Sequence, residues 1–440
     1  MNIHAQSLTP IYVTEEINQP FTLYEGKMKI LSDSPERDII AQGTGSIKLA
    51  WFPRIRLKYS FNCDNLITFD LTKEHYLELS HLKISCKATA TSSTDSSSVV
   101  SQKTYISGFL NEPVANASSQ NISYLIFHIT NFYGYRGDII QNSSVIWFGR
   151  LLLQANGWKV TIDSLEQKAF DQLTNSLENE GGYAITHVAK LERIDNQIFT
   201  AEQALDVLSS LSYFLSFSAG LWVAPILPTG FDSDNNPIWQ QWSSHVASSY
   251  RNVSSWFPIQ EPQNLTEAFV GFMTLWNDQD WQQPLKLAIH WYVESNLQAG
   301  GIEGSIIFAH SSLELLYQHW IGIFNNDAAK KLEKLFEKAR LPLKCTDMPS
   351  KLDSLENLLK FTTDKNISLP KAITEVRNKV THLKRNDEIH HVSVRIETWR
   401  LSLWYLELVL LHLFNYQGVY KNRLRFAWEG DYDKLPWEQP

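Results

Sequence analysis

The chain has 440 residues and a formal net charge of −8, with 43% hydrophobic and 20% charged residues. This length allows two or three domains around a large core, and the ordinary balance of apolar and charged residues excludes a wholly disordered chain. The acidic balance argues against a general nucleic-acid coat but not against a local site, because 21 Lys and Arg nearly balance 22 Asp and Glu from residue 263 onward.

The cysteines and the apolar stretches point to a cytoplasmic protein without a membrane segment. Cys63, Cys86 and Cys345 are widely spaced and form no C-x-x-C pair, which argues against a disulfide framework or a zinc knuckle. The polar N-terminus lacks a signal pattern. Two long apolar stretches, 207–231 and 401–420, contain Ser, Gly and Pro or charged residues, so we interpret both as buried parts of a core.

The first 160 residues have the pattern of a β-rich region. Short apolar or alternating runs are separated by Gly and Asn turns, which is typical of a sandwich or a barrel. Residues 88–98 are nearly all small or hydroxylated, so we expect an exposed loop there. The expected strands lie near residues 11–13, 21–24, 55–61, 66–71, 82–85, 124–129, 145–148 and 159–162.

Between residues 163 and 258 the pattern is mixed. A helix is predicted over 165–177 and a stronger one over 200–217, with Thr200 as its N-cap. Residues 183–193 fit a strand or the entry to a helix, and 220–226 resemble a strand. We interpret this zone as the end of the front domain.

From residue 264 the pattern becomes almost entirely helical. Breakers such as Gly300-Gly301, Pro342 and Pro349 separate the helices, and short loops between long amphipathic helices predict an antiparallel bundle. The last helix is apolar almost all round, which predicts a central position. The predicted helices span residues 264–277, 284–298, 303–324, 327–341, 350–361, 369–385 and 392–416.

The predicted fold class is therefore α+β with two domains. Residues 1–260 form a β-rich, sandwich- or barrel-like N-terminal domain with some helices, for which we expect a sensing or regulatory role. Residues 261–440 form an all-α helical bundle.

The most informative motif is the run from Arg377 to His382 inside a predicted helix. Asn378 and His382 lie one turn apart on the same face, away from the apolar stripe, and Arg377 flanks that stripe. A long guanidinium arm can reach round a helix, so the three groups can converge in one cleft. A fixed cation beside an imidazole suits phosphodiester chemistry.

The Arg-Asn-x-x-x-His run, late in a helical region and followed by one long apolar helix, resembles the HEPN superfamily of helical bundles. Residues 403–423, from Leu403 to Arg423, resemble the tail of ApeA-like anti-phage proteins, which join a β-rich front to a C-terminal HEPN domain. Two further segments, 183–187 and 215–220, are similar to the same group.

This resemblance implies a metal-independent endoribonuclease that needs no cofactor. Two copies of the motif would line one cleft in a homodimer or a higher homo-oligomer. RNA, with transfer RNA as one candidate, would be cut by attack of its own 2′-OH. Arg377 would stabilise phosphate charge, His382 would transfer the proton, and Asn378 would position the substrate or the ring. A phage-derived trigger would release the inhibition imposed by the front domain.

Other residues of the same region are candidates for supporting roles. Lys379, Lys384 and Arg385 would attract RNA through its phosphates, or would form an ordinary solvated face. Glu314, on an earlier helix, would face the cleft and tune His382, or would form an ion pair elsewhere. No carboxylate cluster suggests a metal site.

Two other classes of function remain open from the sequence. In the first, the helical region is a non-catalytic dimerisation or ligand-binding module of a defence or stress-response system, and Arg377 and His382 are surface or capping residues. In the second, the front domain acts on carbohydrate or nucleotide, but no paired carboxylates support hydrolysis there. His187 and Arg193 fit a core or turn role better than a site.

Overall fold

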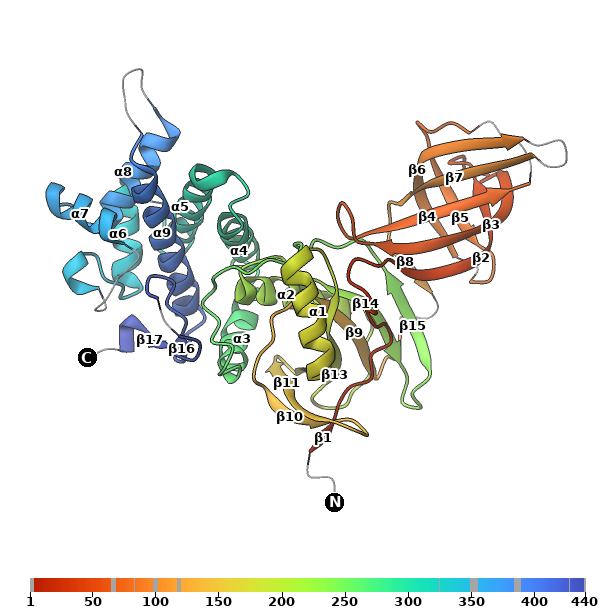
Figure 1. Cartoon of the computed structure of the whole chain (residues 1–440), viewed down its shortest axis with the longest axis horizontal. Helices are drawn as coiled ribbons and strands as arrows, with labels where there is room; N and C mark the ends of the chain where they lie inside the picture. Colours follow the sequence, from red (N-terminus) through yellow and green to blue (C-terminus); the bar gives the residue numbers. More distant parts are fainter. Residues whose placement is uncertain are drawn as a thin grey trace.

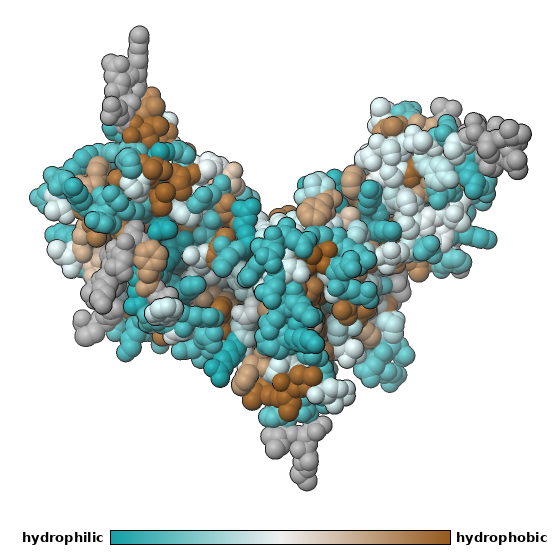
Figure 2. All heavy atoms as spheres, viewed as in Figure 1, coloured by the Kyte–Doolittle hydropathy of each residue, from teal (hydrophilic) through white to brown (hydrophobic). Residues whose placement is uncertain are grey.

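The computed structural model has three parts in a row: a β-barrel, a large sheet with helices, and a group of C-terminal helices (Figure 1). The barrel and the C-terminal helices lie at the two ends and rise on the same side of the sheet, so the outline is V-shaped (Figure 2). The structure describes residues 4–64, 69–82, 84–97, 102–116, 120–323, 325–348, 355–383, 389–426 and 428–438.

Six antiparallel strands form a closed barrel, in the order β2-β3-β4-β7-β6-β5. The alternation of apolar and polar residues explains the two faces of each strand, since Leu57, Tyr59 and Phe61 of β4 are buried inside the barrel. The strands are β2 (Phe21–Leu31), β3 (Ile39–Ala50), β4 (Arg56–Cys63), β5 (Glu74–Leu79), β6 (Ile84–Ser97) and β7 (Gln102–Leu110).

Strand β6 corrects the loop that was predicted at residues 88–98. Ala88 and Ala90 are buried in the barrel core, so the small residues alternate between inside and outside. The hydroxyl groups find partners on β7: the Ser92 and Ser107 oxygens lie 2.8 Å apart, and the Thr104 hydroxyl donates to the Asp95 carboxylate at 2.7 Å. Cross-strand pairing therefore allows a polar, flexible-looking segment to form a strand.

A nine-stranded sheet occupies the centre of the molecule, in the order β1-β10-β11-β12-β13-β9-β14-β15-β8. All neighbouring strands are antiparallel except β1 and β10. The strands are β1 (Ala5–Gln6), β8 (Val114–Asn116), β9 (Tyr124–Thr130), β10 (Asp138–Gln141), β11 (Ile146–Ala155), β12 (Trp158–Ser164), β13 (Ile185–Arg193), β14 (Pro225–Phe231) and β15 (Pro237–Trp242).

Two helices of the front half pack on this sheet, α1 (Gln167–Glu180) against β11 and α2 (Ala201–Ala219) against β14. The predicted N-cap of α2 is confirmed. The Thr200 hydroxyl accepts a hydrogen bond from the backbone N–H of Gln203 at 3.3 Å, and the Gln203 side chain accepts one from the Thr200 N–H at 3.0 Å. This capping box satisfies two N–H groups that the helix leaves unpaired.

The C-terminal helices surround α9, which confirms the predicted central position of the last long helix. It contacts α3, α4, α5, α7 and α8 and is buried along most of its length. The helices are α3 (Gln263–Trp276), α4 (Gln282–Asn296), α5 (Gly301–Trp320), α6 (Ala328–Lys338), α7 (Glu356–Lys365), α8 (Leu369–Thr381) and α9 (Val392–Leu413). A strand pair follows α9, β16 (Val419–Tyr420) with β17 (Asp433–Lys434), and 3-10 turns lie at Cys345–Asp347 and Pro436–Glu438.

The predicted fold class, a β-rich domain followed by an all-α HEPN bundle, is wrong. Large sheets dominate the chain, and the C-terminal region contains the β16–β17 pair as well as helices. The physical reason is that α3 packs on β11 and α2. One hydrophobic core therefore joins Phe127 of the sheet, Phe214 of α2 and Trp404 of α9. The division of the chain at residue 260 stays a prediction.

Within the parts of the chain that the structure describes, none of the helices has both the length and the apolar character needed to cross a bilayer.

Candidate functional site

Helix α8 carries the predicted catalytic residues. Ser368 caps its start by accepting a hydrogen bond from the Lys371 N–H, and Pro370 occupies the first turn, where its missing N–H costs nothing. Ala372, Ile373 and Val376 form its buried side. His382 is the C-cap residue, and its N–H donates to the Asn378 carbonyl at 2.9 Å.

The Arg377 side chain turns toward α5, away from Asn378 and His382. Its Nη2 lies 3.2 Å from the Glu314 carboxylate and 3.2 Å from Nδ1 of His310. The Arg377 side chain is 17% exposed and that of Glu314 25%. This is a half-buried ion pair with an imidazole as a second acceptor.

His310 is the buried member of this cluster, and its tautomer follows from its neighbours. Because Arg377 can only donate, Nδ1 of His310 must accept, so the proton lies on Nε2, 3.4 Å from the Thr374 hydroxyl oxygen. That hydroxyl donates to the Pro370 carbonyl at 2.9 Å. Burial lowers the pKa of His310 to about 3, and the charges of Arg377 and Lys331 act in the same direction.

An open cavity of about 600 Å³ lies between α6 and α8. Asn378, Lys379 and His382 line it together with Lys371 and Thr374, whereas Arg377 does not. Thr374 thus connects the cavity wall to the buried His310. The cavity combines an imidazole, an amide, three ammonium groups (Lys330, Lys371 and Lys379) and three carboxylates (Asp327, Glu333 and Glu375).

The carboxylates around this cavity are already engaged. Glu375 pairs with Lys365 at 2.5 Å, and Glu333 pairs with Lys330 at 3.0 Å. Asp327 caps α6 by accepting from the Lys330 N–H at 2.8 Å. Because each of these carboxylates already accepts from a donor, its negative charge is partly neutralised. The carboxylates therefore repel an anionic ligand in the cavity less strongly than free carboxylates would.

The structure thus brings together only some of the residues singled out from the sequence. Asn378, Lys379 and His382 share the cavity, while Arg377 and Glu314 contact each other on another side of α8. Lys384 and Arg385 lie outside the described residues. Among the described residues, no group of three or more His, Cys, Asp or Glu side chains is arranged to hold a metal ion.

Sequence reasoning missed the contact between Arg377 and His310. The two residues are 67 positions apart, so no local pattern connects them. The only local signal was the spacing of His310 and Glu314, four residues apart on one helix, which places both side chains on one face.

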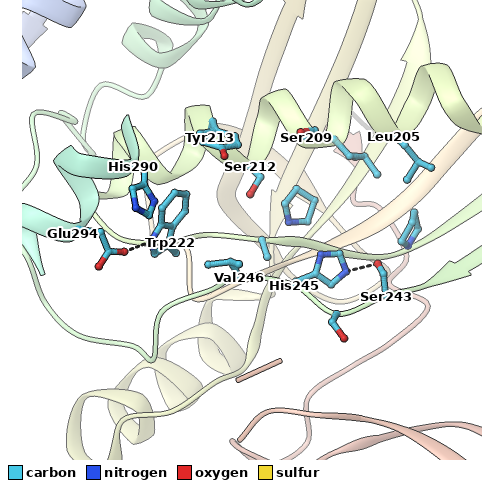
Figure 3. A pocket seen from close by; sticks show the side chains of 15 residues that line it. Leu205, Ser209, Ser212, Tyr213, Trp222, Ser243, His245, Val246, His290 and Glu294 are labelled. Atoms are coloured by element: carbon cyan, nitrogen blue, oxygen red, sulfur yellow. Dashed lines mark hydrogen bonds between the residues drawn. The ribbon is translucent and has the colours of Figure 1, made fainter. Parts of the chain in front are cut away.

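The front half contains a separate cavity of about 460 Å³, bordered by α2, β14, α4 and the segment 243–246 (Figure 3). Trp222 donates its indole N–H to Glu294 at 2.8 Å, and the Ser243 hydroxyl lies 3.0 Å from Nε2 of His245. Loss of hydration lowers the pKa of His245 to about 4. The lining is mainly apolar with a few polar groups, which is typical of small-molecule sites.

His187 lies in the core, outside these cavities. It is buried in β13 and stacks on Tyr135 with the ring centroids 5.4 Å apart. Burial lowers its pKa to about 3. Arg193 pairs with Asp195 at 3.1 Å at the end of the same strand.

Two family models match parts of the chain. Residues 117–253 match the YopA central domain, and residues 278–433 match the YopA C-terminal domain. The chain is 25% identical over 442 residues to the SPbeta prophage-derived uncharacterized protein YopA of Bacillus subtilis (strain 168), and the alignment covers 98% of both chains. No solved structure matches the chain. None of these names describes an activity.

Proposed function

We propose that this protein is a metal-independent endoribonuclease that acts in the cytoplasm in defence against phage. The observation that carries the proposal is the shared position of Asn378, Lys379, His382 and Lys371 on one open cavity beside α8. Ammonium groups attract the RNA backbone, and an imidazole can both accept and donate a proton. The resemblance of the Arg-Asn-x-x-x-His run to HEPN ribonucleases supports the same chemistry.

In the proposed reaction the ribose 2′-oxygen attacks the adjacent phosphorus. The bond between this oxygen and phosphorus forms, the bond to the 5′-oxygen breaks, and the 2′-proton leaves as the 5′-oxygen gains one. His382 transfers one of these protons. Asn378 donates an amide hydrogen bond to the substrate, and Lys371 and Lys379 hold phosphates. Lys384 and Arg385, which follow His382 in the sequence, are proposed to attract RNA through its phosphates.

In this mechanism Arg377 binds phosphate only after it has left Glu314. A phosphate that approaches α8 competes with Glu314 for the guanidinium, because both are anions that accept from the same donors. The pair is partly exposed, so its exchange requires little desolvation. In this proposal Glu314 holds Arg377 until RNA arrives.

A homodimer is the proposed assembly, with two motifs in one cleft. Three apolar side chains are exposed where α8 ends and α9 begins: Leu383 is 50% exposed, Ile389 42% and Val392 47%. Figure 2 shows brown, hydrophobic surface at these ends of α8 and α9. Their closeness to His382 along the chain supports an interface near the proposed site.

The front part is proposed to control cleavage in response to a phage-derived trigger. The cavity beside Trp222 and His245 is a candidate binding place for a small trigger (Figure 3). The Bacillus relative is named as prophage-derived, which fits a role in conflict between phage and host.

The competing proposal is a non-catalytic binding or dimerisation module. The contacts of Arg377 with Glu314 and His310 favour it, since a structural ion pair needs no reaction. The two proposals differ in what they require of His382.

The test is to map new RNA ends in cells that strongly express the wild type, His382→Ala or His319→Ala. His319 is an exposed histidine of α5 whose ring packs on the edge of Trp281, so it serves as a matched control. New ends with the wild type and the control, but not with His382→Ala, would support the ribonuclease. If all three strains contained identical RNA during phage challenge, the ribonuclease proposal would be contradicted and the non-catalytic module would be favoured.

A further inference from the structure

A third cavity, of about 460 Å³, lies where the central sheet region meets the C-terminal helices. Its walls come from the segment after Tyr250, the end of α4, the middle of α9 and the chain after β16. Five cationic residues line it, and none of the described lining residues is Asp or Glu. The five are Arg251, Arg400, Lys421, Arg423 and Arg425.

Two of these cations are already neutralised. Arg423 is 3% exposed and pairs with Glu407, with Nε of the guanidinium 2.9 Å from the carboxylate. It also donates to Asn296 Oδ1 at 3.1 Å and to the Ser254 carbonyl at 3.2 Å. Arg425 pairs with Asp431 and Asp433. These groups form a fixed, nearly neutral floor.

The other three cations carry uncompensated charge. Within the described part of the chain, the Arg251 side chain donates a single long hydrogen bond, 3.4 Å to the Leu297 carbonyl, and neither Arg400 nor Lys421 has an ion-pair partner. Three positive charges facing one cavity attract an anion, and the chain as a whole carries −8. The excess of positive charge at this cavity therefore does not reflect the net charge of the chain, which is negative.

Aromatic surfaces lie beside these charges. Trp399 and Phe426 line the same cavity, and Phe426 is 77% exposed. An adjoining cavity of about 410 Å³ shares Lys421 and Arg425 with it and adds Tyr250 and Tyr432, together with the carboxylates of Glu178, Glu429 and Asp431. Bases stack on aromatic rings while phosphates pair with Lys and Arg, so the combination matches both halves of a nucleotide.

We infer that this cavity, the nucleotide groove, binds a ligand made of a base and phosphate, either a free nucleotide or the end of a single strand. Arg251, Arg400 and Lys421 hold the phosphate, and Phe426 offers a surface to the base. A cavity of this volume accommodates a ligand of that size. The groove is separate from the α6–α8 cavity and does not depend on cleavage at His382.

The groove also joins two parts of the molecule. Arg251 lies on the connection from the sheet region, whereas Arg400 belongs to α9. A phosphate held by both would tighten the junction between the sheet and the C-terminal helices. The groove is therefore a place where ligand binding can act on the arrangement of the two parts.

The test is calorimetric binding to the full chain with inorganic phosphate, AMP, ATP and a 5′-phosphorylated tetrauridylate as probes. We expect nucleotide binding that weakens with salt, and at least about tenfold weaker affinity for Arg400→Glu/Lys421→Glu. The control Lys48→Glu/Lys58→Glu makes the same charge change at exposed positions of the barrel. Phe426→Ala should weaken AMP binding and leave phosphate binding unchanged.

The result with each probe and variant decides one part of the inference. Tighter binding of the tetranucleotide than of ATP identifies a strand as the ligand, and the reverse identifies a free nucleotide. Absence of binding of every probe to the wild type would overturn the inference, as would equal losses in the groove variant and the barrel control. If AMP bound no more tightly than phosphate, the proposed contact between the base and Phe426 would be contradicted. Circular dichroism and thermal melting of each variant exclude a folding defect.

Discussion

Two Arg–Glu pairs in the C-terminal region show how burial separates a structural ion pair from one that can exchange. Arg423 and Glu407 are 3% and 1% exposed; the Tyr292 hydroxyl donates a further hydrogen bond to Glu407, and Arg423 donates one to the side-chain oxygen of Asn296. Arg377 and Glu314 are 17% and 25% exposed, and their additional partner is His310. Loss of the partner of a buried charge costs much free energy, whereas a partly exposed charge can replace its partner with water or phosphate.

The largest expected effect is the loss of the buried partner. Glu407→Gln leaves the Arg423 guanidinium buried with only neutral acceptors, so we expect the free energy of unfolding to fall by about 3–5 kcal/mol. Urea unfolding followed by circular dichroism measures this change. A control, Glu407→Leu with Arg423→Met, removes both charges and should be less harmful than the single change. A loss near zero for Glu407→Gln would contradict the comparison.

The second expected effect concerns activity. If Arg377 leaves Glu314 to bind phosphate, Arg377→Lys should reduce RNA cleavage by about 100-fold, because an ammonium cannot reproduce the planar set of donors. The readout is the yield of new RNA ends in cells expressing equal amounts of protein. Arg54→Lys, at an exposed position beside the barrel, is the matched control. Undiminished cleavage by Arg377→Lys and by Arg377→Ala would make Arg377 purely structural.

The helices around these pairs could largely be predicted from sequence, because capping and amphipathic spacing are local properties. Ser368 before Pro370 marks the start of α8, and Thr200 marks the start of α2. Strand β6 could not be predicted, since its Ser and Thr side chains become satisfied only by β7. The fold class failed for a similar reason: the packing of α3 on β11 is a long-range contact that no pattern in α3 reveals.

The candidate site shows the same limit. The pairing of Asn378 with His382 follows from helical geometry, and both side chains do line one cavity. The direction of Arg377 depends on His310 and Glu314, which are more than sixty residues away. Sequence spacing limits where a long side chain can reach but does not choose its partner.

A third prediction uses the acid sensitivity of the Arg377 cluster. His310 has a folded pKa of about 3, lowered by burial from 6.5, and faces the charges of Arg377, Glu314 and Lys331. Between these values the unfolded chain binds a proton that the folded chain excludes, so stability falls as the pH drops below 6.5. From pH 7 to pH 5 this histidine alone should cost about 2 kcal/mol.

The matched variant is His310→Gln, which keeps an acceptor for Arg377 and a donor for Thr374 but does not titrate. His128 and His187, whose pKa values burial also lowers to about 3, contribute equally to both proteins and cancel in the difference. Urea unfolding at pH 7 and pH 5 should show a smaller loss for the variant. Equal losses in both proteins would indicate that His310 is protonated without penalty.

The smallest expected effect concerns the more exposed of the two ion pairs, that of Arg377 with Glu314. Glu314→Gln repeats the change made at Glu407, but here the guanidinium can turn to solvent, so we expect a loss of no more than about 1 kcal/mol in the free energy of unfolding. If Glu314 restrains Arg377 until RNA arrives, cleavage by this variant should be equal to or above that of the wild type. A stability loss as large as that of Glu407→Gln would mean that Arg377 is locked in place. Arg377 would then hold α8 against α5, and the proposed chemistry would depend on His382 and the cationic groups of the α6–α8 cavity.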